Sequence, residues 1–150
     1  MIKKIVGKVW KIMPYRMRIK VVRSVQKKFT VSVVAIVTNK KNEILILDHY
    51  FRPGASWGLP GGFIDPYEQA ENGIRREIKE ETDLELENIN LLKVRTIGKH
   101  LEILFIAEGI GKAKVNSQEI KELGWFALDD LPKNMGETQL EWIDTYLRKQ

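Results

Sequence analysis

Residues 58–84 read GLPGGFIDPYEQAENGIRREIKEETDL, and the fold and chemistry expected of the chain follow from this segment. A glycine pair, Gly61-Gly62, leads into a segment whose apolar periodicity predicts a helix over residues 67–82. Residues three and four apart share one face of a helix, and like charges at that spacing repel each other. Three carboxylates lie on one face of this predicted helix: Glu77, Glu80 and Glu81.

The acidic cluster has two physical explanations. Arg75, Arg76 and Lys79 stand in the same segment, so the cluster can be a solvated face of mixed charge, which composition alone favours. Alternatively, a hard divalent cation holds the carboxylates together. The glycine pair favours the cation, because backbone without side chains can approach a ligand closely.

The spacing of residues across the stretch decides between these explanations. It runs Gly62-x5-Glu68-x7-Arg76-Glu77-Ile78-x-Glu80-Glu81-x-Asp83-Leu84. This pattern resembles the signature of the Nudix hydrolase family, G-x5-E-x7-R-E-U-x-E-E-x-G-U, in which U is an apolar residue. Asp83 is the one fixed position that departs from it, because it replaces a glycine. The resemblance covers residues 29–132 and includes the W-x-L-P-G-G entry and the later segment GWFALDDLP.

The resemblance implies a metal site. Nudix enzymes bind divalent cations through acidic side chains of this helix, and the cations assist hydrolysis of a pyrophosphate bond. Either Glu80 or Glu81 would also orient or deprotonate the attacking water. Glu119 is expected as an extra ligand or general base, with Glu122 as the alternative. The implied ligands of Mg²⁺, or of Mn²⁺ in its place, are Glu77, Glu80, Glu81 and the carbonyl oxygen of Gly61.

The same resemblance assigns supporting residues. Arg76 and Glu68 match positions that pair with each other and brace the loop against the helix. Asp83 tolerates a left-handed backbone better than most residues, so we expect the turn at the helix end to persist. Tyr67 stands where many family members have glycine.

Candidate substrate contacts precede the glycine pair. Arg52 is expected to bind phosphate, and Trp57 is expected to stack on a base, with packing in the core as the alternative for Trp57. His100 is expected to be structural. Three neighbouring residues are open to either role: His49, Tyr50 and Phe51.

Length and composition limit the other possibilities. The chain has 150 residues, which is enough for one domain with a real core. It has no cysteine and two histidines, which excludes thiolate chemistry and disfavours a multi-histidine zinc site, so a metal would be held by oxygen. No apolar run reaches the roughly 20 residues that span a bilayer, and no secretory signal is evident, so we expect a cytoplasmic protein.

Apolar, β-branched runs alternate with helical segments along the chain, which predicts a mixed α/β or α+β class. The family resemblance implies an α/β/α sandwich with a mixed central sheet. The expected strands occupy residues 29–38, 44–47, 89–97, 101–107 and 125–128, and the expected helices of this domain occupy 67–82 and 139–147.

The first 28 residues differ from the rest in charge. They contain ten Lys or Arg and no acid, whereas residues 29–150 hold 15 basic and 20 acidic side chains. Helical spacing predicts two short helices in this segment, broken near Pro14. We therefore expect a basic amphipathic extension over 1–28 and a Nudix domain over 29–150. The apolar stripe is expected to pack on the domain or on a homodimer partner, with an anionic membrane surface or nucleic acid as alternatives.

The expected activity is Mg²⁺-dependent hydrolysis of a small nucleotide, a nucleoside diphosphate linked to another group. Residues 93–100 lack the proline of ADP-ribose enzymes and the tyrosine of diadenosine polyphosphate enzymes, which leaves nucleoside triphosphates and nucleotide sugars. The alternative is a Nudix module that binds a nucleotide or RNA, or that hydrolyses the 5′ end of RNA, with the help of the basic extension.

Overall fold

Strand β1 (Thr30–Thr38) lies at the centre of one mixed sheet. It pairs in parallel with β6 (His100–Ile110) along its whole length, and antiparallel with β2 (Ile44–His49) and β4 (Gly61–Phe63). Both faces of β1 are covered, which explains its nearly continuous apolar sequence. The computed structural model describes residues 2–148, and the other strands in that range are β3 (Trp57–Gly58), β5 (Glu85–Ile97) and β7 (Ile120–Phe126).

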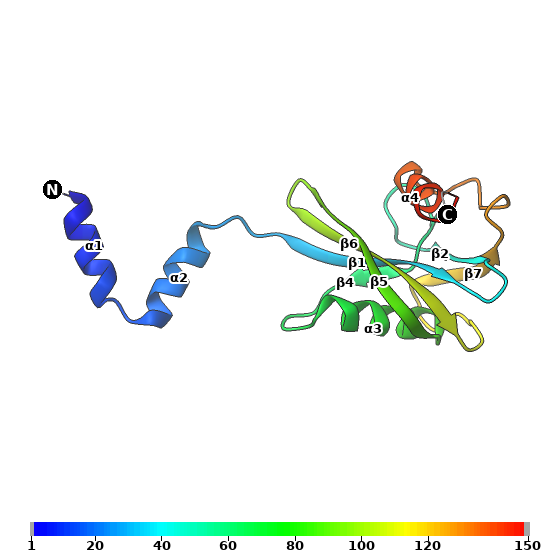
Figure 1. Cartoon of the computed structure of the whole chain (residues 1–150), viewed down its shortest axis with the longest axis horizontal. Coiled ribbons are helices and arrows are strands. Elements are labelled where there is room, and N and C mark those ends of the chain that lie inside the picture. The colour runs from blue at the N-terminus through cyan, green and yellow to red at the C-terminus, as the bar shows by residue number, and fades with distance from the viewer. Residues whose placement is uncertain (1, 149–150) are drawn as a thin grey trace.

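One helix covers each face of the sheet (Figure 1). Helix α3 (Ala70–Thr82) buries Ile74 and Ile78 against one face, and helix α4 (Glu137–Leu147) buries Trp142 and Ile143 against the other. Alternate residues of β1 point to the two cores: Val33, Ala35 and Val37 face α3, and Val34 and Ile36 face α4. The three layers confirm the predicted α/β/α class with a mixed central sheet.

Element boundaries differ from the sequence prediction at several places. Helix α3 begins at Ala70 instead of residue 67, because Tyr67 has a left-handed φ of 71° and cannot lie in a helix. Strand β7 begins at Ile120, where the charged Lys121 and Glu122 hide the strand pattern. The short strands β3 and β4 lie in a stretch rich in glycine and proline, which reads as a loop.

Two helices precede the sheet: α1 (Ile2–Ile12) and α2 (Tyr15–Val25), divided at Pro14. Figure 1 shows them standing apart from the body of the molecule, joined to β1 by a short linker. The expectation that their apolar stripe packs on the domain is wrong, because Ile12 is 82% exposed, Val25 is 74% exposed, and α2 buries no residue. Among residues 2–148, no helix has both the length and the apolar character to cross a membrane. We call residues 2–28 the arm.

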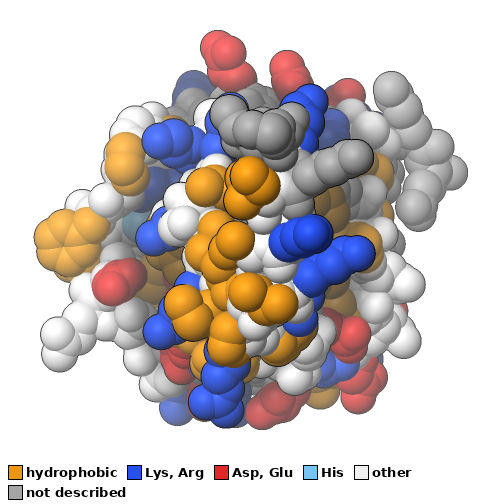
Figure 2. Space-filling model, turned by 90° about the vertical axis from the view of Figure 1, so that its left-hand side faces the viewer, with side chains coloured by type: hydrophobic (Ala, Val, Ile, Leu, Met, Phe, Trp, Pro, Cys, Tyr) orange, Lys and Arg blue, Asp and Glu red, His pale blue; other side chains and the backbone are white. Residues whose placement is uncertain are grey.

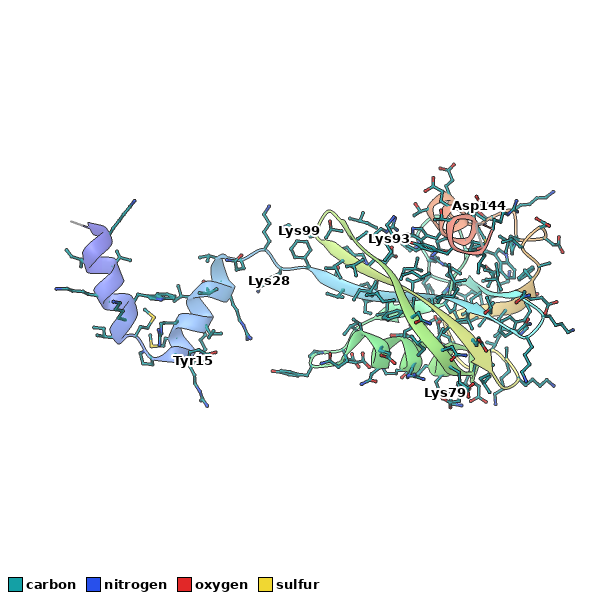
Figure 3. The ribbon with its side chains drawn as sticks, in the orientation of Figure 1. Tyr15, Lys28, Lys79, Lys93, Lys99 and Asp144 are labelled. Atoms are coloured by element: carbon teal, nitrogen blue, oxygen red, sulfur yellow. The ribbon has the colours of Figure 1, made fainter. Side chains whose placement is uncertain are left out.

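The linker reaches the sheet beside the β5–β6 turn. The backbone N–H of Thr30 donates a hydrogen bond to the carbonyl of Lys99 at 3.0 Å. Figure 3 labels Lys28 on the linker and Lys99 at the tip of the β5–β6 hairpin, and both lie at the end of the body that faces the arm. The arm therefore leaves the domain next to the end of the sheet where Ser32 and His100 are placed.

Candidate functional site

Strand β4 brings the glycine pair into the sheet. Gly61 and Gly62 pair with Val34 and Val33 of β1. Gly61 has a φ of 145°, and a Cβ at this position would lie 2.1 Å from the carbonyl oxygen of Val33, so only glycine fits. The backbone N–H of Gly61 donates to Oε2 of Glu81 at 3.1 Å, which ties the end of α3 to the strand.

A single guanidinium organises the loop between β4 and α3. Arg76 donates to both oxygens of Glu68, at 2.9 and 3.0 Å, in the bidentate geometry that suits a carboxylate. It also donates to Oε1 of Glu77 at 2.8 Å, to Oε2 of Glu80 at 3.2 Å and to the carbonyl of Phe63 at 3.0 Å. These contacts hold the pKa of Glu68 down, at about 2, and raise that of Arg76.

Glu81 lies deepest of the three helix carboxylates. It is 7% exposed, and the N–H of Gly61 is the one hydrogen-bond donor to its carboxylate within residues 2–148. Burial raises the pKa of Glu81 to about 8, the Gly61 N–H opposes this rise, and the charges of Glu77 and Glu119 add to it. Burial also raises the pKa of Glu77, against the contact with Arg76. A buried carboxylate with so few donors is suited to a bound cation.

The acids line one cavity of about 370 Å³, which we call the acid cavity. Acidic side chains are the most frequent kind in its lining, and carboxylate oxygens are ligands that suit a hard cation. In the described part of the chain, no three acidic or histidine side chains lie close enough together to hold a metal ion. Arg76 binds one carboxylate oxygen of Glu77 and one of Glu80, so a cation bound here would share these two side chains with Arg76 or displace it. The lining includes Gly61, Arg76, Glu77, Glu80, Glu81, Ser117 and Glu119.

A second cavity, also of about 370 Å³, adjoins the first. Gly61, Gly62, Phe63 and Glu119 line both, so Glu119 stands at the boundary between them. We call this one the adjoining cavity. It is lined further by aromatic and basic side chains and by polar groups, including Ser32, His49, Phe51, Arg52 and His100.

Two basic side chains of the adjoining cavity carry unused nitrogens. Nη1 of Arg52 and Nε2 of His49 are buried and have no hydrogen-bond partner among the described residues. Burial and the charge of Arg52 lower the pKa of His49 to about 4, so this imidazole is neutral at neutral pH. Burial also lowers the pKa of Arg52, which the charges of Glu102 and Glu81 oppose. Both groups are suited to an anionic or polar ligand.

His100 is held rigidly at the far wall of the adjoining cavity. Its Nδ1 lies 2.7 Å from Oγ1 of Thr30, and its Nε2 lies 2.8 Å from Oγ of Ser32. The ring of Phe63 meets it edge-on, with centroids 5.8 Å apart. Phe63 is exposed enough to contact a ligand as well as the histidine.

Two of the sequence candidates lie elsewhere. Trp57 packs in the core on the α4 side, with its ring edge-on to Phe126 at a centroid distance of 5.6 Å, and it lines neither cavity. This position matches the packing alternative. Glu122 is exposed on β7 opposite Asp48 and lines neither cavity, unlike Glu119.

Sequence reasoning missed Ser32, Phe63 and Ser117. Ser32 and His100 are 68 residues apart and meet only through the parallel pairing of β1 with β6. The position of Phe63 directly after the glycine pair was the available signal, because it puts an aromatic side chain beside the loop between β4 and α3.

Asp83 ends α3 in the expected left-handed conformation, with φ 59° and ψ 13°. Lys79 and Lys114 both reach its carboxylate at 2.9 Å and lower its pKa to about 2. Asp83 thus keeps the turn that glycine would make and adds two ion pairs. The family departure at this position leaves the helix end intact.

The family model described as NUDIX domain matches residues 28–146. The chain belongs to the Nudix family. A solved structure titled MutT NUDIX hydrolase from Burkholderia pseudomallei is 31% identical, with a TM-score of 0.71 over 79% of this chain and 98% of that one.

Two curated relatives give the range of named Nudix proteins that this chain resembles. The "ADP-ribose pyrophosphatase" of Methanocaldococcus jannaschii is 35% identical over 104 residues, which is 65% of this chain and 62% of that protein. The "NAD-capped RNA hydrolase NudC" of Pectobacterium carotovorum is 26% identical over 103 residues, 67% of this chain and 40% of that protein. The match thus spans less than two thirds of each of these two proteins.

Proposed function

We propose that this Nudix chain hydrolyses a pyrophosphate bond of a small nucleotide with the help of a divalent cation, Mg²⁺ or Mn²⁺. The observation that carries the proposal is the contact between the two cavities. One collects carboxylates around Gly61, the other offers cationic and aromatic side chains, and Glu119 lines both. A diphosphate spanning the boundary would have its bridging bond beside the acids.

The ligands in this proposal are Glu77, Glu80, Glu81 and the carbonyl of Gly61. A divalent cation bound there would offset the charge of the pyrophosphate and lower the pKa of the attacking water. Glu68 restrains Arg76 through two hydrogen bonds, so that the loop after β4 stays in place when Glu77 and Glu80 bind the cation. Glu119 lines both cavities, so in this proposal it would orient the attacking water or accept its proton.

Arg52 and His49 would bind the substrate on the other side of the boundary. Arg52 lines the adjoining cavity, and its guanidinium would donate to a phosphate oxygen. Phe51 and Phe63 are exposed and would stack on a base or pack on the second group. Trp57 is not included, because it is part of the core.

The substrate class is best tested by a screen with Mg²⁺ and with Mn²⁺. The panel should contain nucleoside triphosphates, nucleotide sugars, ADP-ribose, NAD, and RNA with a 5′-triphosphate or an NAD cap, since the names of the relatives include ADP-ribose and NAD-capped RNA. We expect turnover of free nucleotides that requires the added cation. Binding without turnover of any member, in either metal, would favour a non-catalytic nucleotide- or RNA-binding module.

Variants of the acids test the proposed roles. We expect Glu80→Gln and Glu81→Gln each to lower kcat by roughly a hundredfold or more, because the amide removes a charged cation ligand of nearly the same shape. Glu122→Gln is the matched control and should keep full activity. Circular dichroism and thermal unfolding would verify that all three variants fold. Wild-type turnover by both Glu80→Gln and Glu81→Gln across the panel would refute the proposal.

A further inference from the structure

The arm carries an apolar face that nothing in the described structure covers. Ile5, Val6, Val9 and Ile12 lie at helical spacing on α1, and all four are exposed. Helix α2 adds exposed Tyr15, Met17, Val21, Val22 and Val25. Figure 2, which faces the arm end of the molecule, shows hydrophobic side chains in a central stripe with Lys and Arg along both sides. The stripe points outward, away from the sheet.

The charge of the arm limits what can cover this stripe. Residues 1–28 contain ten Lys or Arg and no Asp or Glu. Two arms packed stripe to stripe would bring these cations together without any counter-charge, which disfavours a second copy of the arm. An RNA backbone would neutralise the lysines but would leave the aliphatic side chains in water. An anionic lipid surface satisfies both features, because acyl chains take up the stripe while headgroups meet the cations beside it.

We propose that the arm binds the surface of a membrane that contains anionic lipids, with the apolar stripe of α1 buried at the level of the headgroups. Each helix has 11 residues, too few to span a bilayer, and an amphipathic helix of this kind would lie in the plane of the interface. Lysines that border the stripe can extend their ammonium groups to the phosphates while their methylene stems cover apolar surface. The inference is independent of the hydrolase activity proposed above.

Exposed apolar side chains continue from the arm onto the body, at the place where the linker joins β1. Phe29 and Ile97 are exposed, and the backbone of Lys99 accepts the hydrogen bond from Thr30 where the linker joins β1. The next residue, His100, lines the adjoining cavity. A membrane-bound arm would therefore hold the adjoining cavity close to the lipid surface.

Vesicle sedimentation of the full chain tests this proposal. We expect binding to phosphatidylcholine vesicles that contain phosphatidylglycerol, weaker binding to phosphatidylcholine alone, and weakening by salt. The pair Lys8→Gln and Lys11→Gln should weaken binding by roughly 30-fold, from about 1 kcal/mol for each lysine near the surface. The matched control is Lys40→Gln with Lys41→Gln, which removes the same charge from the exposed β1–β2 turn and should change nothing.

A second pair separates lipid from other partners. Val6→Gln with Ile12→Gln keeps the charge and a good helix former, and it should weaken vesicle binding by at least roughly tenfold. Its matched control, Leu91→Gln with Val94→Gln, changes exposed apolar residues of β5 and should bind as the wild type does.

Three outcomes would overturn the proposal. The first is an absence of wild-type binding to the anionic vesicles. The second is binding that falls with the lysine pair but not with the Val6 and Ile12 pair, together with salt-dependent binding of single-stranded RNA, which would identify a polyanion site. The third is a solution mass of twice 17.4 kDa that the Val6 and Ile12 pair returns to one chain, which would assign the stripe to a second copy.

Discussion

The acid cavity and the arm both concentrate charge of one sign, and the structure treats the two concentrations in opposite ways. Around the cavity, Arg76 meets carboxylates of Glu68, Glu77 and Glu80, and Glu81 is buried against Gly61. In the arm, the cations have no acid of their own segment to meet, and the apolar side chains between them are exposed. The acid cluster is thus braced by its own chain, whereas the cations of the arm have no counter-charge within their own segment.

This difference predicts that the same kind of substitution lowers the free energy of unfolding strongly near the acid cavity and weakly in the arm. Near the cavity, backbone and side chains are fixed by several partners at once, so one change disturbs them all. In the arm, α2 buries no residue and the apolar side chains of the stripe are exposed, so the loss of one of them removes little stability.

The largest effect is expected for Gly61→Ala. Its Cβ would lie 2.1 Å from the carbonyl oxygen of Val33, at a φ that L-residues rarely adopt. Overpacking and backbone strain should together lower the free energy of unfolding by about 3 kcal/mol or more, measured by urea denaturation. Gly136→Ala is the control, because nothing lies within 4 Å of the added carbon and its φ is −67°. Equal stability of the two variants would show that β4 can move to accept the added carbon. The backbone beside the acid cavity would then be no more tightly fixed than the arm.

The next effect is expected for Arg76→Lys. Lysine keeps the charge but cannot bind Glu68 through two parallel hydrogen bonds while also reaching Glu77 and Phe63. We expect a loss of about 2 kcal/mol in the free energy of unfolding, by the same measurement. Arg23→Lys in α2 is the matched control from the arm and should leave it unchanged, since Arg23 is exposed. A similar loss in both variants would mean that the bidentate contacts contribute nothing.

A smaller effect is expected at Asp83, where the helix ends. Lys79 and Lys114 lower its folded-state pKa to about 2 from 3.8, so its ionised form stabilises the fold above pH 3.8. That stabilisation is lost as the pH falls through 3.8 toward 2, because the unfolded chain binds the proton first. Asp83→Gly should remove this part of the acid sensitivity while keeping the left-handed turn.

Asp83→Ala completes the test of the helix end. Alanine loses the same ion pairs but meets the steric cost of the left-handed conformation, so it should be less stable than Asp83→Gly by roughly 1 kcal/mol. Thermal unfolding measured between pH 2 and pH 7 reports both the loss of the ion pairs and the steric cost of the turn. The pH values should lie on both sides of the change in pKa from 3.8 to about 2. An Asp83→Gly variant with an unaltered pH profile would exclude the two lysines as the cause.

The sequence predicted those parts of the candidate site that belong to one helix and the loop before it. Glu68, Arg76 and the three helix glutamates belong to one segment, so their proximity follows from local geometry. Trp57 could not be assigned in this way, because its exposure depends on α4 and β7, which lie far along the chain. Ser32 and His100 meet through strand pairing, and local periodicity carries no information on such register.

The arm was predicted correctly in its helices and wrongly in its packing on the body. Helical spacing and Pro14 were enough to indicate two short helices, because both are local properties. An apolar stripe usually faces a core, but the domain does not cover this one, and packing on a homodimer partner stays a prediction. The partner of the stripe depends on groups outside the segment, so the sequence of the arm indicates only the apolar and basic character of the arm itself.

The smallest effect is expected for Gly7→Ala, the counterpart of Gly61→Ala in the arm. Gly7 lies inside α1, and nothing stands within 4 Å of an added Cβ. Alanine favours a helix by roughly 0.5–1 kcal/mol over glycine, so slower amide hydrogen exchange in α1 is expected. The urea midpoint of the body should stay at the wild-type value, because α1 shares no core with it. A clear shift of that midpoint would mean that the arm and the sheet unfold as one unit, contrary to the exposure of the stripe.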